Sequence, residues 1–168
     1  MGSASRIKRL ILGVAILSSS ILLDQATKNI ATQHLRLKPP FSFMGDSVRL
    51  QYAENKGAFL GLGNRLSPTV RFWLLTVATT LLLVGLCIFL IVKWNTSQPS
   101  FIALTLILSG GIGNMIDRIF NDGRVIDFLN LGVGSLRTGI FNVADIAITV
   151  GCILLWFSTK TGDRSAVE

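Results

Sequence analysis

The chain has 168 residues, of which half are apolar and only 15% are charged, and its mean hydropathy is +0.59. A soluble domain carries about 25% charged residues, so the composition excludes an ordinary soluble fold and indicates a single integral membrane domain over residues 1–168. The formal net charge is +7, but the Lys and Arg residues are scattered through loops, which excludes a nucleic-acid partner and favours anionic membrane lipids as the partner of these charges.

Four apolar stretches are long enough to cross a bilayer as helices, at about residues 7–23, 70–92, 101–119 and 141–159. The first follows the basic sequence RIKR, a pattern that cleaved signal peptides share. No small-x-small cleavage site follows, because the next residues are LLDQATK, so we interpret the segment as a retained helix. The sequence therefore predicts an all-α polytopic membrane protein with four transmembrane helices.

The Lys and Arg residues that flank these helices bear on the orientation of the helices in the membrane. Four spans place both termini on one side, which carries six Lys and Arg residues against ten on the other side. This count opposes cytoplasmic termini under the positive-inside rule. We still predict cytoplasmic termini, because the first helix often dominates and RIKR directly precedes it.

Two segments outside the spans have strand patterns. The loop from Lys28 to Pro68 is too long for a simple connector, and its SVRLQYAE stretch alternates apolar and polar residues. Further on, VIDFLNLG and TGIFNVAD are separated by the Gly-rich turn sequence GVGSLR. We predict a small extramembrane β-platform on the helix ends, with a strand edge that offers main-chain pairing to an extended peptide.

Four carboxylates gather at one membrane face. Asp24 ends the first predicted helix, Asp117 ends the third, and Asp145 opens the fourth, while Asp127 lies in the strand-like segment before it. The Gly-rich turn between Asp127 and Asp145 allows the chain to reverse and to bring the two together. Because two carboxylates at one site cannot both ionise cheaply, one keeps a proton. Such a pair supplies the acid and the base of an aspartic peptidase, without a metal or cofactor.

A structural role is the alternative for each of the two aspartates. Asn142 lies three residues before Asp145, which matches a helix N-cap followed by an acidic third residue. Asp127 also fits an exposed loop. The catalytic interpretation depends on the polar residues that accompany the pair rather than on either aspartate alone.

The richest of these polar segments is GGIGNMIDR at residues 110–118, which places Asn114, Asp117 and Arg118 on one helical face. Arg118 can hold a carboxylate or a carbonyl, or it can form a structural pair with Asp117 or Asp24. The glycines allow close contact between membrane helices.

Two shorter motifs are weaker signals. Asp24 and Lys28 are four residues apart in DQATK, which also fits a simple surface ion pair. Asn55 and Gly57 in ENKGAFLGLG are typical of an ordinary turn. With a single histidine and two cysteines inside apolar runs, the chain has no zinc-site pattern, and we expect no metal.

In this order, the motifs resemble those of the bacterial lipoprotein signal peptidases, also called signal peptidase II. The matching stretches are DQATK at 24–28, NKGAF at 55–59, GGIGNMIDR at 110–118, VIDF at 125–128 and FNVADIAITVG at 141–151. The resemblance implies an intramembrane aspartic endopeptidase without a cofactor. Its substrate would be the signal peptide of a prolipoprotein, cleaved before a cysteine that carries diacylglycerol.

The resemblance also implies roles for individual residues. The catalytic pair would be Asp127 and Asp145. The supporting and substrate-binding residues would be Asp24, Lys28, Asn55, Gly57, Asn114, Asp117, Arg118 and Asn142. We expect a monomer in the bacterial inner membrane, with cytoplasmic termini and with the platform and active site near the outer leaflet. NKGAF has one small residue between its glycine and its aromatic residue where family members commonly have two, which leaves the roles of Lys56 and Phe59 open.

Two other classes of function remain as alternatives. A transporter or proton channel would spread carboxylates along a path through the bilayer and would show an inverted repeat, and the sequence has neither pattern. A non-catalytic assembly factor would use its Asp and Arg residues only to hold helices together. Replacing Asp127 by Asn separates this class from an enzyme, because only an enzyme would lose turnover while it still folds.

Overall fold

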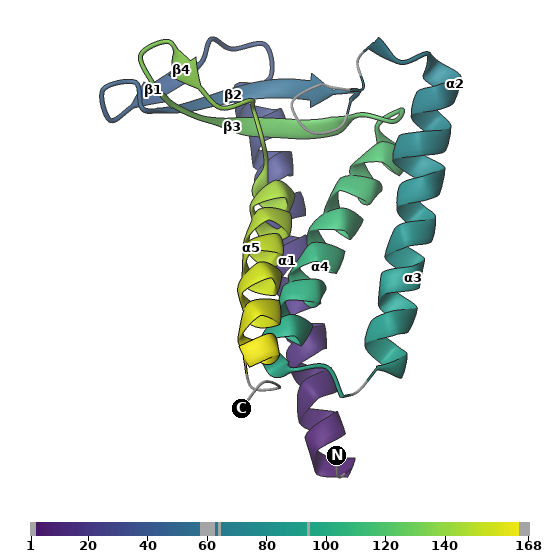
Figure 1. Ribbon diagram of the computed structural model, residues 1–168. Coiled ribbons are helices and arrows are strands. Elements are labelled where there is room, and N and C mark those ends of the chain that lie inside the picture. The colour runs from purple at the N-terminus through teal and green to yellow at the C-terminus, as the bar shows by residue number, and fades with distance from the viewer. Residues whose placement is uncertain (1–2, 58–62, 64, 94, 165–168) are drawn as a thin grey trace.

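The computed structural model of the chain describes residues 3–57, 63, 65–93 and 95–164. The helices are α1 (Ser3–Leu35), α2 (Pro68–Arg71), the π-helix η2 (Phe72–Ala78), α3 (Thr79–Val92), α4 (Gln98–Phe120) and α5 (Val143–Arg164). The strands are β1 (Phe41–Phe43), β2 (Val48–Asn55), β3 (Val125–Val133) and β4 (Leu136–Arg137). The long helices run side by side, and the sheet lies across one end of them (Figure 1).

Three helical segments of the described chain are long and apolar enough to cross a membrane, Ser3–Leu35, Pro68–Val92 and Gln98–Phe120. Helix α5 adds a shorter apolar stretch, Val143–Ser158. Many of their large apolar side chains are exposed, as expected of surfaces that face lipid instead of water. These helices confirm the prediction of a mostly helical membrane protein.

Helix α1 extends well beyond the predicted span at 7–23. It continues through DQATK to Leu35, so the expectation that Asp24 ends the first helix is wrong. The extension carries buried residues, among them Asp24, Lys28 and Ala31, which pack against the rest of the protein. Tertiary contacts of these side chains, rather than hydrophobicity, keep this segment helical.

The second span contains an irregularity that its uniform apolar sequence does not signal. Ser67 caps α2, because its hydroxyl accepts a hydrogen bond from the Val70 backbone N–H. After this turn, the chain adopts the π-helix η2 before it returns to an α-helix at Thr79. Short π-helical segments often occur at functional sites, and Leu75 of η2 and Thr79 line the main cavity described below.

Helices α4 and α5 approach closely through glycines. A Cβ atom at Gly151 of α5 would lie 2.7 Å from the backbone oxygen of Ala103 in α4. A Cβ atom at Gly110 would in turn collide with the Ala144 carbonyl. This agrees with the expected role of glycines in membrane helix packing, and it brings the first turn of α5 next to Asn114 and Asp117 of α4.

The sheet is antiparallel throughout, in the order β1-β2-β3-β4. Strand β2 pairs with β3 from Val48 opposite Leu131 to Asn55 opposite Val125, with a bulge between Leu50 and Ala53. The predicted strand at SVRLQYAE is confirmed. The predicted partner strand at TGIF is wrong, because β4 is formed by Leu136–Arg137, while Phe141 makes only an isolated bridge to Leu129.

The glycine contact predicts the effect of a single methyl group. Gly151→Ala should lower the free energy of unfolding by about 2 kcal/mol, since the Cβ atom meets the backbone of α4 and forces the helices apart. Gly85→Ala in α3 is the matched control, because a Cβ atom there meets nothing within 4 Å. Thermal unfolding in detergent measures both, and equal stability of the two variants would contradict the packing.

Candidate active site

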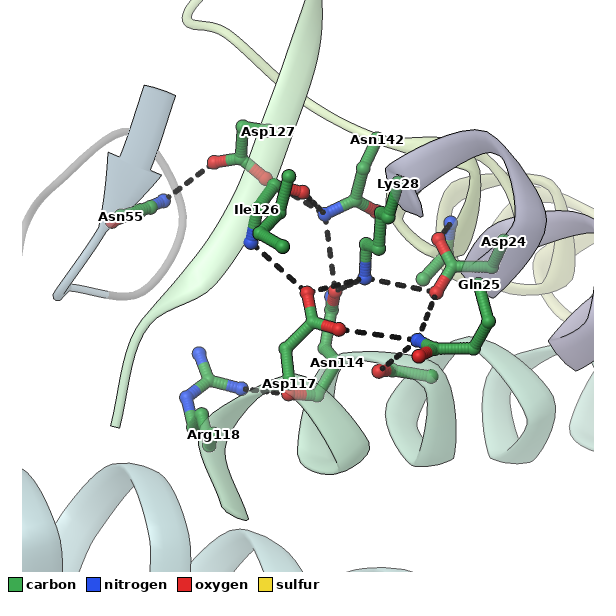
Figure 2. Close-up of polar contacts among 12 residues, drawn as sticks. Asp24, Gln25, Lys28, Asn55, Asn114, Asp117, Arg118, Ile126, Asp127 and Asn142 are labelled. Atoms are coloured by element: carbon green, nitrogen blue, oxygen red, sulfur yellow. Dashed lines mark hydrogen bonds and ion pairs between the residues drawn. The ribbon is translucent and has the colours of Figure 1, made fainter. Parts of the chain in front are cut away.

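The site is built around a lysine that is almost completely buried. Lys28 is 2% exposed, and its Nζ lies 2.8 Å from Asp24 Oδ2 and 2.9 Å from Asp117 Oδ2 (Figure 2). It also donates to Asn114 Oδ1 over 3.0 Å. An isolated buried ammonium group is very costly, so these three acceptors are what allow it to stay charged. The alternative of a simple surface ion pair is therefore wrong.

The two carboxylates around Lys28 also hold backbone N–H groups of neighbouring elements. Asp24 Oδ1 accepts from the Ala144 N–H at the start of α5, and Asp117 Oδ2 accepts from the Ile126 N–H of β3, each over 2.9 Å. Gln25 Nε2 reaches Asp24 Oδ2 and Asp117 Oδ1 and so joins them on the other side (Figure 2). The charged cluster thus fixes α1, α4, α5 and β3 relative to one another.

Gln25 is a site residue that the sequence reasoning missed, although it lies inside DQATK next to Asp24. The alternative pairing of Arg118 with Asp117 or Asp24 is also not found. Within the described residues, both of these carboxylates pair with Lys28 instead.

Asn114 connects the Lys28 cluster to Asp145. Its Oδ1 accepts from the Lys28 ammonium, so its Nδ2 must point the other way, where it donates to Asp145 Oδ1 over 2.9 Å. An ammonium group has only donors, and it therefore determines which end of the amide faces the carboxylate. The cation thus positions Asp145 without touching it.

Asn142 connects the two predicted catalytic residues. Its Nδ2 donates to Asp127 Oδ1 over 2.7 Å and to Asn114 Oδ1 over 3.1 Å. Its Oδ1 accepts from the Asp145 N–H, and Asp145 Oδ2 accepts from the Asn142 N–H over 3.2 Å. The N-cap interpretation is therefore confirmed, and the same contacts place Asp145 in the network of Asp127.

Asp127 lies in β3 and is 2% exposed, so the alternative of an exposed loop is wrong. Its Oδ2 accepts from Asn55 Nδ2 over 2.9 Å, and the Asn55 side chain also accepts from the Gly57 N–H. Burial raises the pKa of Asp127 to about 6, an effect that the Asn55 hydrogen bond opposes and the negative charge of Asp145 reinforces.

A cavity of about 700 Å³ connects these groups. Asp127, Asp145 and Arg118 line it, together with apolar residues of η2 and α5. Arg118 donates weakly to the Asn114 carbonyl oxygen over 3.5 Å, and its buried Nε has no hydrogen-bond partner among the described residues. The cavity therefore combines two carboxyl groups with a guanidinium group that has unused donors.

All ten predicted site residues belong to this connected region. Asn55, Gly57, Asn114 and Arg118 line the cavity with the two aspartates, while Asp24, Lys28, Asp117 and Asn142 form the network behind it. The lining also includes residues 137–141, which the sequence did not single out for the site. The departure noted in NKGAF concerns residues 58 and 59, which lie outside the described residues.

Comparison with known proteins places this site in a family. The sequence model of signal peptidase (SPase) II matches residues 16–160. The chain belongs to the signal peptidase II family. It is 38% identical to a lipoprotein signal peptidase of Chlorobium phaeobacteroides (strain BS1), over 82% of this chain and 90% of that protein. It is 34% identical to a lipoprotein signal peptidase of Halalkalibacterium halodurans, over 87% of this chain and 90% of the relative.

The fold agrees with a solved structure of a bacterial membrane enzyme, determined by the in meso method at 2.3 Å resolution. The TM-score is 0.77 at 27% sequence identity, and the match covers 89% of this chain and 88% of that one. This member of the signal peptidase II family therefore shares the fold of a bacterial membrane enzyme.

The buried lysine predicts a large effect on stability. Lys28→Met keeps the apolar stem but leaves Asp24 and Asp117 buried without their cation, which should cost about 3–5 kcal/mol of unfolding free energy. Lys38→Met, at an exposed position, is the control and should change stability by less than about 0.5 kcal/mol. Denaturation in detergent measures both, and a Lys28→Met protein as stable as the control would contradict the assigned network.

Proposed function

We propose that this signal peptidase II is an intramembrane aspartic endopeptidase with Asp127 and Asp145 as its catalytic pair. Its substrate is a prolipoprotein with a diacylglyceryl-modified cysteine, and cleavage removes the signal peptide directly before that cysteine. The single observation that carries the proposal is that two carboxyl groups line one cavity and are linked through Asn142. Asp127 accepts a hydrogen bond from the Asn142 side chain, and Asp145 accepts one from the Asn142 backbone N–H. The names of the related lipoprotein signal peptidases support the substrate class.

The chemistry requires one proton on the pair. In the proposed mechanism Asp127 carries this proton, which its pKa of about 6, raised by burial, favours, and Asp145 is the base. Asp145 takes a proton from a water molecule, whose oxygen attacks the scissile carbonyl carbon, and the carbonyl oxygen becomes a gem-diol hydroxyl as it receives the Asp127 proton. When the C–N bond breaks, the amine leaves with the proton held by Asp145, and the diol returns a proton to Asp127 as the new carboxylic acid forms.

Arg118 serves substrate binding in this scheme. Its Nε is buried at the cavity without a partner among the described residues, so a substrate carbonyl is a suitable acceptor for it. Such a contact would hold the substrate backbone extended beside the aspartates. No covalent enzyme intermediate is needed.

The proposed orientation has four transmembrane helices, cytoplasmic termini and an active site near the outer leaflet of the bacterial inner membrane. The sheet lies at one end of the helices, and the start of α1 and the last turn of α5 lie at the other (Figure 1). The two aspartates belong to the sheet end, since Asp127 is in β3 and Asp145 is in the first turn of α5. From the aspartates, the cavity continues along Leu75 and Thr79 on one side and along Ile146, Thr149 and Val150 of α5 on the other. An apolar signal peptide would lie along these residues and reach the site from the bilayer. In this proposal the enzyme is a monomer, and its partners are the prolipoprotein and the membrane lipids.

Substitution of either aspartate tests the catalytic assignment. Asp127→Asn and Asp145→Asn should each lower the cleavage rate of a diacylglyceryl-modified prolipoprotein by at least about 10²-fold, because the amide can neither take up nor supply the required proton. Asp122→Asn is the control, since Asp122 is exposed in a turn with a positive φ that Asn also adopts.

The measurement is release of the signal peptide by the purified protein, with thermal unfolding to check folding. Normal cleavage by either active-site variant would refute the paired mechanism. Equal processing of the precursor that lacks diacylglycerol would refute the substrate assignment alone.

The pH profile tests the proton on Asp127. Because the reaction needs Asp127 protonated, kcat/KM should fall as pH rises through the pKa of about 6 in the free enzyme. The Asn55 hydrogen bond lowers this pKa, so Asn55→Ala should move the falling limb to higher pH. A limb that stays in place or moves to lower pH in Asn55→Ala would contradict the assignment of the proton.

A further inference from the structure

The half of the sheet that is distant from Asp127 has one apolar and one polar face. Side chains alternate between the faces of a strand, and residues paired across an antiparallel ladder lie on the same face. By this register, one face carries Phe41, Phe43, Val48, Leu50, Leu129, Leu131, Val133 and Leu136. The other carries Ser42, Arg49, Asn130, Gly132 and Arg137. We call the first set the apolar sheet face.

The polar face is closed by its own contacts. Arg137 donates from Nε to Asn130 Oδ1 over 2.5 Å and from Nη1 to the Asp46 carbonyl over 2.7 Å. Its side chain lies so close over Gly132 that a Cβ atom there would be 2.6 Å from Arg137 Cγ. The polar groups of this face are therefore paired within the sheet and its turn.

The apolar sheet face, in contrast, is open along its outer part. Phe43 is 50% exposed, Val133 is 78% exposed and Leu136 is 83% exposed. Contiguous exposed apolar side chains of this kind mark a surface that contacts another apolar phase.

The packing of Leu50 and Leu129 indicates the direction of this face. Both pack, together with Phe128, against Ala31 and Leu35 at the end of α1. Phe128 and Leu129 point to the same side because β3 has a bulge there, where both of their N–H groups donate to the Phe141 carbonyl. The apolar sheet face is thus the one turned toward α1 and the other helices, and Asp127 lies on the opposite face.

The apolar sheet face is also continuous with a surface that faces lipid. The helix against which it packs, α1, carries exposed apolar side chains on its preceding turns, among them Leu22, Leu23 and Ile30. The strands run across the ends of the helices, so the sheet extends sideways beyond α5 (Figure 1). A lipid bilayer around the helices would meet this overhanging part of the sheet.

We propose that the apolar sheet face is a membrane-binding surface that lies in the headgroup region of the leaflet next to the sheet. Its side chains insert to the depth of the headgroup and acyl boundary, as those of interfacial amphipathic helices do. Because Asp127 lies in β3 of the same sheet, this contact also sets the depth of the active site relative to the membrane. The proposal does not depend on the identity of the catalytic residues.

Fluorescence quenching by lipids tests this surface. The full chain, with Trp73, Trp94 and Trp156 replaced by Phe, carries either Phe43→Trp or Leu136→Trp as a reporter on the apolar sheet face. Ser42→Trp is the matched control, since it neighbours Phe43 but lies on the polar face. The proteins are placed in vesicles of phosphatidylethanolamine and phosphatidylglycerol, with or without a phosphatidylcholine brominated in its upper acyl chain.

We expect the brominated lipid to lower the emission of Phe43→Trp and Leu136→Trp at least about two-fold and to leave Ser42→Trp nearly unchanged. None of these three positions lines the cavity, so retained peptidase activity confirms that the variants fold. Equal quenching of reporter and control would overturn the proposal. Blue-shifted emission of the reporters without quenching would also overturn it, because a second copy or bound substrate would then cover the face.

Discussion

The structure depends on one buried cation that is shared by three acceptors. Lys28 lies between Asp24 and Asp117 and donates to Asn114, and the same two carboxylates accept hydrogen bonds from N–H groups of α5 and β3. Each charge of this cluster satisfies the others, so none is left alone in an apolar environment. Four separate segments of the chain consequently meet with a fixed geometry at the end of the helices.

Two side-chain amides connect this cation to the aspartates at the cavity. The ammonium group fixes the orientation of the Asn114 amide, and Asn114 and Asn142 in turn fix the two aspartates at the cavity. Asn142 and Asp145 serve two purposes at once, because the contacts that cap α5 also position the Asp145 carboxyl group. A structural and a catalytic interpretation of these residues are therefore compatible.

Much of this arrangement could be predicted from the sequence. The apolar runs indicated the helices, the alternation in SVRLQYAE indicated β2, and polar residues that are costly near a membrane indicated the site. The continuation of α1 past Asp24 could not be predicted, because it depends on contacts of Lys28 with residues far away in the sequence. The π-helix and the short β4 likewise depend on packing and register, for which the local sequence has no strong signal.

The most direct test of the central claim is an experimental structure with a peptide analogue whose scissile carbonyl is replaced by a carbon that bears a hydroxyl group. We predict this hydroxyl oxygen within hydrogen-bond distance, about 2.6–3.2 Å, of a carboxyl oxygen of both Asp127 and Asp145. Asn114 and Asn142 would keep their present contacts in such a complex. A hydroxyl group bound to only one of the carboxyl groups, or a peptide backbone that lies outside the cavity, would contradict the account.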